Sequence, residues 1–184
     1  MNGREGARWP GPIYLDTSAL IKLFVPEAES DVLNEALVGA TDVVVSDLAL
    51  TEMASALGRR TREGLLTPAE ARRLLGEAGR LARACRRAEL TPPTHRRAER
   101  LLLTAGSALR SLDALHVALA IDAGASTIVT YDSRLAQAAT GQHLFVEPGT
   151  IGEVEGKADR AGKARRSSAT RRRRRSGKVP PETR

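Results

Sequence analysis

Apolar residues in this chain are grouped in two alternating ways. Short apolar runs such as "PIYLD", "DVVVS" and "ASTIVTYD" end in polar residues, which is typical of buried strands. Between these runs, apolar residues recur with the spacing of one helical face. The strands we expect cover residues 12–16, 42–46, 88–93, 125–132 and 143–149. Strands that alternate with helices predict an α/β fold around a central parallel sheet.

The helical segments have recognisable start and stop signals. Pro26 stops the first helix and Gly39 closes the second, whereas Ser46 or Asp47 caps the third. Thr94 is the expected N-cap of the fifth helix. The expected helices cover residues 17–25, 29–40, 47–64, 67–87, 94–106, 112–124 and 133–141.

The helix expected over residues 112–124 has almost no polar face, which predicts that it is buried. It nevertheless contains Asp113, which helical spacing places between Val117 and Ala120. A carboxylate in apolar surroundings is costly unless it is paired, hydrogen-bonded or bound to a metal. Asp113 is therefore a candidate functional residue.

Three further acids occupy comparable positions. Asp16 and Asp132 end two expected strands, and Glu52 lies in the second turn of a helix that follows a strand. Right-handed crossovers bring such positions toward one edge of a parallel sheet, where ligands bind. Any one of these acids is explained by the preference of carboxylates for helix N-termini. Together, four crowded carboxylates need a compensating cation, and all-oxygen ligands suit Mg²⁺ or Mn²⁺.

Composition restricts the class of protein. The chain has 184 residues, 41% of them apolar, which is compatible with one folded domain. Its single cysteine, Cys85, allows no internal disulfide, so we expect a cytoplasmic protein. No run of eighteen apolar residues is present, and we expect no membrane span and no membrane partner.

The net charge of +7 is unevenly distributed. Residues 149–184 carry 12 Lys and Arg against 4 Asp and Glu, and they have few large apolar residues. We therefore expect a flexible leader over residues 1–12, a folded domain over residues 13–148 and a disordered basic tail over residues 149–184. The tail is either a solvated end or a nonspecific arm that binds nucleic-acid phosphates.

An arginine-rich helix is expected over residues 67–87. Its apolar residues form one stripe, and six arginines lie on the opposite side. Such a face is usually a solvated surface. Phosphate binding becomes the better explanation only if an active site for nucleic acid lies nearby. In that case the residues expected to bind RNA are Arg72, Arg73, Arg80 and Arg83.

Other catalytic motifs are absent. The sequence contains no HExxH zinc motif, no GxSxG serine nucleophile and no complete phosphate-binding P-loop. His116 lies three residues after Asp113, close enough along the helix for contact with the acid cluster, but we favour a histidine at the core edge, bonded to a backbone group. "LDTSA" lacks the second aspartate of haloacid-dehalogenase phosphatases.

Four segments in order, "IYLDTSALIKLFVPE", "SDLALTEMASAL", "LRSLDALHVALA" and "IVTYDSRLAQAA", resemble the PIN domain, and in particular VapC-type toxin ribonucleases. The resemblance implies an α/β/α sandwich, a homodimer and a cognate antitoxin that occludes the site. It also implies that Asp16, Glu52, Asp113 and Asp132 surround one or two divalent ions. Ser18 and Thr130 occupy positions that support this cluster by hydrogen bonds.

The expected function is that of a toxin that cleaves RNA phosphodiester bonds with water activated by Mg²⁺. Two alternatives stay open at this point. One is a binding module for RNA or DNA, whose acidic site is inactive and whose arginine tail binds the nucleic acid. The other is a phosphate-transfer domain, in which Asp16 or Asp132 accepts the phosphoryl group.

Overall fold

The computed structural model describes residues 9–104 and 109–148. Five strands in these residues form one all-parallel sheet in the order β3-β2-β1-β4-β5. The strands are β1 (Ile13–Leu15), β2 (Val43–Ser46), β3 (Arg86–Ala88), β4 (Thr127–Val129) and β5 (Phe145–Glu147). The predicted parallel sheet is confirmed, with β1 at its centre.

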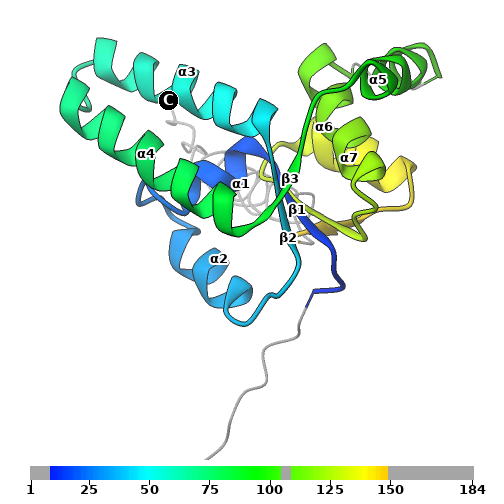
Figure 1. Cartoon of the computed structure of the whole chain (residues 1–184), viewed down its shortest axis with the longest axis horizontal. Coiled ribbons are helices and arrows are strands. Elements are labelled where there is room, and N and C mark those ends of the chain that lie inside the picture. The colour runs from blue at the N-terminus through cyan, green and yellow to red at the C-terminus, as the bar shows by residue number, and fades with distance from the viewer. Residues whose placement is uncertain (1–8, 105–108, 149–184) are drawn as a thin grey trace, which may run out of the picture. The chain divides into compact units, whose positions relative to one another are not determined.

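Helices cover both faces of the sheet (Figure 1). One group comprises α1 (Thr17–Lys22), α2 (Ser30–Leu37), α3 (Asp47–Arg62) and α4 (Pro68–Ala84). The other group comprises α5 (Pro92–Thr104), α6 (Ser111–Asp122) and α7 (Ser133–Gly141). The two groups lie on opposite sides of the strands, so the predicted α/β/α sandwich is confirmed.

Each face of the sheet has its own hydrophobic core. Ile13 and Leu15 of β1 belong to the core beneath α1 to α4, whereas Tyr14 belongs to the core beneath α5 to α7. This division follows from the alternation of side chains along a strand. The second core also contains the fully buried middle of α6, including Val117 and Leu119, as its apolar pattern predicts.

The third strand differs from the sequence prediction. β3 covers residues 86–88 rather than 88–93, and the backbone N–H of Leu90 donates to the Asp47 carboxylate at 3.1 Å instead of to a neighbouring strand. The two prolines that follow begin α5, where the missing N–H costs no helical bond. The prediction that Thr94 caps this helix was wrong. Thr94 is buried inside α5, and its N–H donates to Thr91 Oγ1 at 3.3 Å.

The last residues of the expected leader contact the folded domain. Trp9 packs against the core beneath α1 to α4. The carbonyl oxygen of Pro10 accepts a hydrogen bond from Thr127 Oγ1 at 2.6 Å. Residues 9–12 are thus attached to the start of β4, while residues 1–8 lie outside the described residues.

The chain divides between residues 149 and 150 into two units. The expected basic tail, residues 149–184, lies outside the described residues. In the part of the chain that the structure describes, every helix is too short or too polar to cross a bilayer.

Candidate active site

Four acids that follow different strands meet at one cavity. Asp16 comes directly after β1, Asp132 follows β4, Glu52 lies on α3 after β2, and Asp113 is in the first turn of α6. All four line a cavity of about 350 Å³, which we call the acidic pocket. Because the strands are parallel, their carboxyl ends and the helices that follow them share one edge of the sheet.

Asp16 is the buried carboxylate of the pocket, with 3% of its surface exposed. Its side chain caps α1 by accepting the Ala19 N–H at 2.8 Å. Ser18 donates to Oδ1 at 2.7 Å, and Thr130 donates to Oδ2 at 2.6 Å. Burial raises the pKa of Asp16, although His116 and these hydrogen bonds oppose the effect. A cation beside Asp16 would stabilise its charged form.

Glu52 is held through one of its two oxygens. His116 Nε2 lies 2.6 Å from Glu52 Oε2, and the Thr17 hydroxyl donates to the same oxygen. Burial raises the pKa of Glu52, but the hydrogen bonds from His116 and Thr17 outweigh it, and the net effect is a lowered pKa. Glu52 is therefore an ionised acceptor at neutral pH.

Asp113 and Asp132 stand at helix starts and are more accessible than Asp16. Asp113 accepts the N–H of Arg110 at 3.2 Å, and Asp132 accepts the N–H of Arg134 at 2.8 Å. Asp113 belongs to a mainly apolar helix but is itself partly exposed and lines the acidic pocket. The first turn of α6 emerges from the core, and the neighbouring Leu112 is 46% exposed.

Three pocket residues were not identified as functional from the sequence: Thr17, Arg59 and His116. The expectation that His116 bonds a backbone group was wrong, because its contacts are side chains. The sequence did contain one signal for this position: His116 lies three residues after Asp113, and residues i and i+3 share one face of a helix. Arg59 follows Glu52 by seven residues, which is two helical turns.

A family model described as PIN domain matches residues 13–141. The chain belongs to the PIN-domain family. It is 37% identical over 142 residues to ribonuclease VapC35 of Mycobacterium tuberculosis, an alignment that covers 73% of this chain and 94% of that protein. It is 33% identical over 129 residues to ribonuclease VapC3 of Pyrobaculum aerophilum, covering 68% and 92%. The predicted family is confirmed.

Solved structures share the fold of this PIN domain. VapC20 of Mycobacterium tuberculosis, described as a toxin that cleaves the sarcin-ricin loop, matches with a TM-score of 0.56 and 21% identity, covering 68% of this chain and 94% of that one. VapBC2 of Rickettsia felis, solved with a DNA fragment from its promoter, matches with a TM-score of 0.54 and 14% identity, covering 73% and 96%. At these identities the likeness supports the fold alone.

The four arginines expected to bind RNA do not line the acidic pocket. Arg72, Arg73, Arg80 and Arg83 are exposed on α4, and none of them lines the acidic pocket. Glu77 Oε1 lies 2.8 Å from Arg73 Nη1 and 3.9 Å from Arg80 Nη2. The arginine that lines the pocket is Arg59 of α3, for which the described residues provide no ion-pair partner.

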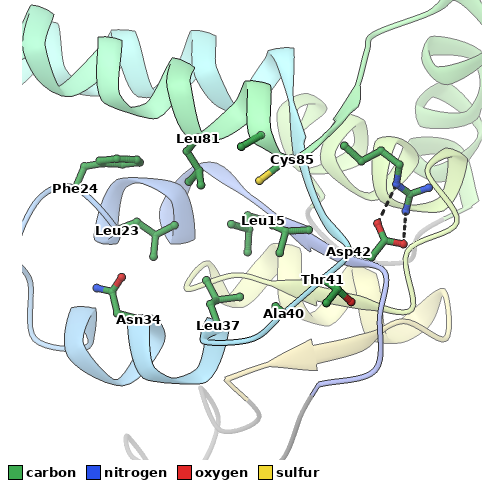
Figure 2. A pocket seen from close by; sticks show the side chains of 13 residues that line it. Leu15, Leu23, Phe24, Asn34, Leu37, Ala40, Thr41, Asp42, Leu81 and Cys85 are labelled. Atoms are coloured by element: carbon green, nitrogen blue, oxygen red, sulfur yellow. Dashed lines mark hydrogen bonds and ion pairs between the residues drawn. The ribbon is translucent and has the colours of Figure 1, made fainter.

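A second cavity of the PIN domain, about 560 Å³ in volume, is mainly apolar (Figure 2). We call it the apolar groove, and none of the four acids lines it. At one rim Arg86 Nε lies 3.2 Å from Asp42 Oδ1. The segment that includes α1 contributes to both cavities, with Ile21 lining the acidic pocket and Phe24 the groove. Leu15, Leu23, Phe24, Leu37, Leu81 and Cys85 provide much of the apolar lining.

The acidic pocket suits a hydrated metal ion better than a metal ion that is enclosed by protein ligands. Among residues 9–104 and 109–148, no three His, Cys, Asp or Glu side chains are arranged to hold a metal ion. Mg²⁺ is usually bound through one or two carboxylates and keeps several of its waters. A cavity of about 350 Å³ has room for a hydrated ion, because one water occupies about 30 Å³. The donor set, all carboxylate oxygens, fits Mg²⁺ or Mn²⁺.

Proposed function

We propose that this PIN domain is the toxin of a type II toxin-antitoxin pair and cleaves RNA phosphodiester bonds in the acidic pocket. The observation that carries the proposal is the convergence of Asp16, Glu52, Asp113 and Asp132 on one cavity in a chain of this family. Relatives named ribonuclease VapC, which the alignments cover over 92 to 94% of their length, support it. A single cysteine, Cys85, is compatible with action in the reducing cytoplasm.

We propose Mg²⁺ or Mn²⁺ as the cofactor of this reaction. When bound, the ion supplies a Lewis acid that activates water and neutralises charge on the phosphate oxygens. Asp16 and Asp113 are its proposed principal ligands, with Asp132 at the exposed rim of the pocket. Ser18 and Thr130 orient the Asp16 carboxylate through the hydrogen bonds described above.

Glu52 is the proposed general base. Its Oε2 accepts from His116 and Thr17, while Oε1 has no hydrogen-bond partner among the described residues. An ionised carboxylate oxygen at the pocket can accept a proton from the attacking water. Direct attack by water requires no covalent intermediate on the protein.

A phosphate-transfer reaction through Asp16 is disfavoured by its hydrogen bonds. Oδ1 accepts from Ser18 and Ala19, and Oδ2 accepts from Ser18 and Thr130. A nucleophilic oxygen in this environment would have to break at least one of these bonds.

An RNA cleavage assay separates a nuclease from a binding module. Purified protein with RNA and Mg²⁺ should yield shortened products and lose this activity in a chelator, whereas retained but intact RNA would favour the binding module.

Arg59 is the proposed contact for an RNA phosphate at the pocket. The four carboxylates repel the RNA backbone, so productive binding requires a cation close to them. Arg59 lines the same cavity, and the described residues offer it no ion-pair partner, in contrast to the adjacent Arg60, which pairs with Glu27. Its guanidinium is thus free to bind a phosphate bidentately.

Arg59→Gln is expected to raise the KM for RNA more than it lowers kcat, and to reduce the slope of log affinity against log salt by about 0.7. Filter binding and cleavage of one oligonucleotide at several salt concentrations measure both effects. Arg62→Gln is the matched control, because Arg62 is exposed on the same helix but does not line the pocket. Equal behaviour of the two variants would contradict the assignment.

The antitoxin is the proposed occupant of the apolar groove. An apolar segment of a partner protein would remove the groove's leucine and phenylalanine side chains from water. The segment around α1 links the groove to the acidic pocket, so a partner that continues along α1 would reach the carboxylates. This arrangement supports occlusion of the site by the antitoxin. A homodimer is also proposed, to be tested by sedimentation.

Leu37→Lys, in the apolar groove, is expected to weaken antitoxin binding at least about tenfold while RNA cleavage persists, because a lysine in the interface would lose hydration. Leu65→Lys is the control, because Leu65 is 66% exposed and does not line the groove. Calorimetric titration with the antitoxin measures the affinities, and melting curves verify folding. Unchanged affinity of the Leu37 variant would exclude the groove as the docking surface.

A further inference from the structure

His116 occupies a bridging position between the core and the acidic pocket. Only 3% of its surface is exposed. Its Nε2 lies 2.6 Å from Glu52 Oε2, and its Nδ1 lies 2.8 Å from the Tyr14 hydroxyl. Tyr14 is completely buried and is also bonded to Ser46 Oγ at 2.9 Å. Both ring nitrogens of His116 therefore have side-chain partners.

The two partners determine the orientation of the imidazole ring. An ionised carboxylate only accepts hydrogen bonds, so the nitrogen that faces Glu52 must carry the hydrogen. Tyr14 is fixed by β1 and Ser46 by its position as the N-cap of α3. Tyr14 therefore holds the Nδ1 edge of the ring on the core side, and the Nε2 edge is directed at Glu52.

The contacts also distinguish the two oxygens of Glu52. His116 and Thr17 both bond Oε2, and Thr17 Oγ1 lies 3.2 Å from His116 Nε2. Oε1 has no hydrogen-bond partner in the described part of the chain. With Oε2 held by two donors, rotation of the carboxylate is restricted, and Oε1 is the oxygen that remains free of these contacts on a residue that lines the acidic pocket.

We propose that His116 is a positioning residue that holds Glu52 Oε2 through Nε2–H and thereby presents Oε1 to the reacting water. The inference rests on the proposed ribonuclease function. His116 does not need to touch RNA for this role. Loss of its bond should therefore affect the chemical step more than the binding of RNA, as is typical of groups that orient a catalytic side chain.

A matched pair of amide variants tests this role. In His116→Gln the amide nitrogen can reach the position of Nε2 and donate to Glu52, whereas in His116→Asn it reaches only the position of Nδ1, near Tyr14. We expect the Asn variant to lower kcat by about 10- to 100-fold with little change in KM, and the Gln variant to recover most of this loss. Melting curves verify that both variants fold.

Equal kcat values for folded Asn and Gln variants, or an Asn variant as active as wild type, would overturn the proposal. An NMR measurement on the wild-type protein gives a test independent of the variants. The ¹⁵N spectrum of the His116 ring should show a hydrogen on Nε2, and a bare Nε2 would also overturn the proposal. Absence of RNA cleavage by the wild-type protein would instead count against the proposed function, while the NMR test of His116 would still apply.

Discussion

Replacing Asp16 with asparagine is expected to lower RNA cleavage by at least about 100-fold. Even residues that only orient a metal ligand typically contribute 10- to 100-fold to activity, and Asp16 is a proposed ligand itself. The substitution removes the charge at the most buried carboxylate of the pocket and keeps the size of the side chain. Its amide oxygen can still accept the Ala19 N–H at the start of α1. The loss should therefore be one of chemistry rather than of folding.

Cleavage of a labelled RNA by purified proteins measures this loss. Asp31→Asn is the control, because Asp31 is exposed on α2 and lies outside the pocket lining. In bacteria, induction of the wild type and of Asp31→Asn should arrest growth, whereas cells that accumulate soluble Asp16→Asn should continue to divide. Comparable cleavage by Asp16→Asn and wild type would remove Asp16 from the catalytic site.

Mg²⁺ is expected to raise the Tm of the wild-type protein by several degrees and to have much less effect on Asp16→Asn. An ion that binds only the folded state contributes about 2.7 kcal/mol at a concentration of 100 times its Kd. For a chain of this size, such a contribution corresponds to a Tm increase of roughly 5 to 10 °C. Asp31→Asn should respond like the wild type. Equal increases for wild type and Asp16→Asn would show that Asp16 is not a ligand.

The same pair of proteins has an expected pH dependence in the absence of metal. Burial raises the pKa of Asp16 in the folded state, so the folded protein holds its proton more tightly than the unfolded chain. The contribution of Asp16 to the free energy of unfolding is then fully present at low pH and is lost as the pH rises through the pKa of Asp16 in the folded protein. Asparagine does not titrate in this range. Relative to Asp16→Asn, the wild type should therefore become less stable as the pH rises from about 4 toward 8, starting near the ordinary aspartate pKa.

Thermal melts in a chelator across this pH range measure the difference between the two proteins. In the asparagine variant the hydrogen bonds to residue 16 do not change with pH, because asparagine does not titrate, so the pH-dependent part of the difference comes from the ionisation of Asp16. Glu52 titrates in both proteins, so its contribution largely cancels. A difference in Tm that is independent of pH would contradict the raised pKa of Asp16.

Most elements were predictable because their signals are local. Gly39 and Gly124 have positive φ angles of 79° and 65° after α2 and α6, a conformation that glycine adopts without strain. Ser46 caps α3 as one of the two predicted candidates. The third strand was misplaced because β3 is an edge strand with the sequence "RRA", which has no apolar alternation. Its position depends on pairing with β2, a contact between distant parts of the chain.

The sequence by itself determined the order of strands and helices along the chain, the burial of the middle of α6 and the positions of four acids at strand and helix ends. These features depend on local periodicity and capping, which neighbouring residues carry. Only the tertiary structure decided that Asp16 rather than Asp113 is the buried carboxylate, because burial depends on what packs over a helix start. It also joined Tyr14, His116 and Glu52, which come from three different elements. Such contacts arise from the packing of β1, α3 and α6, and no spacing along the chain encodes their distances.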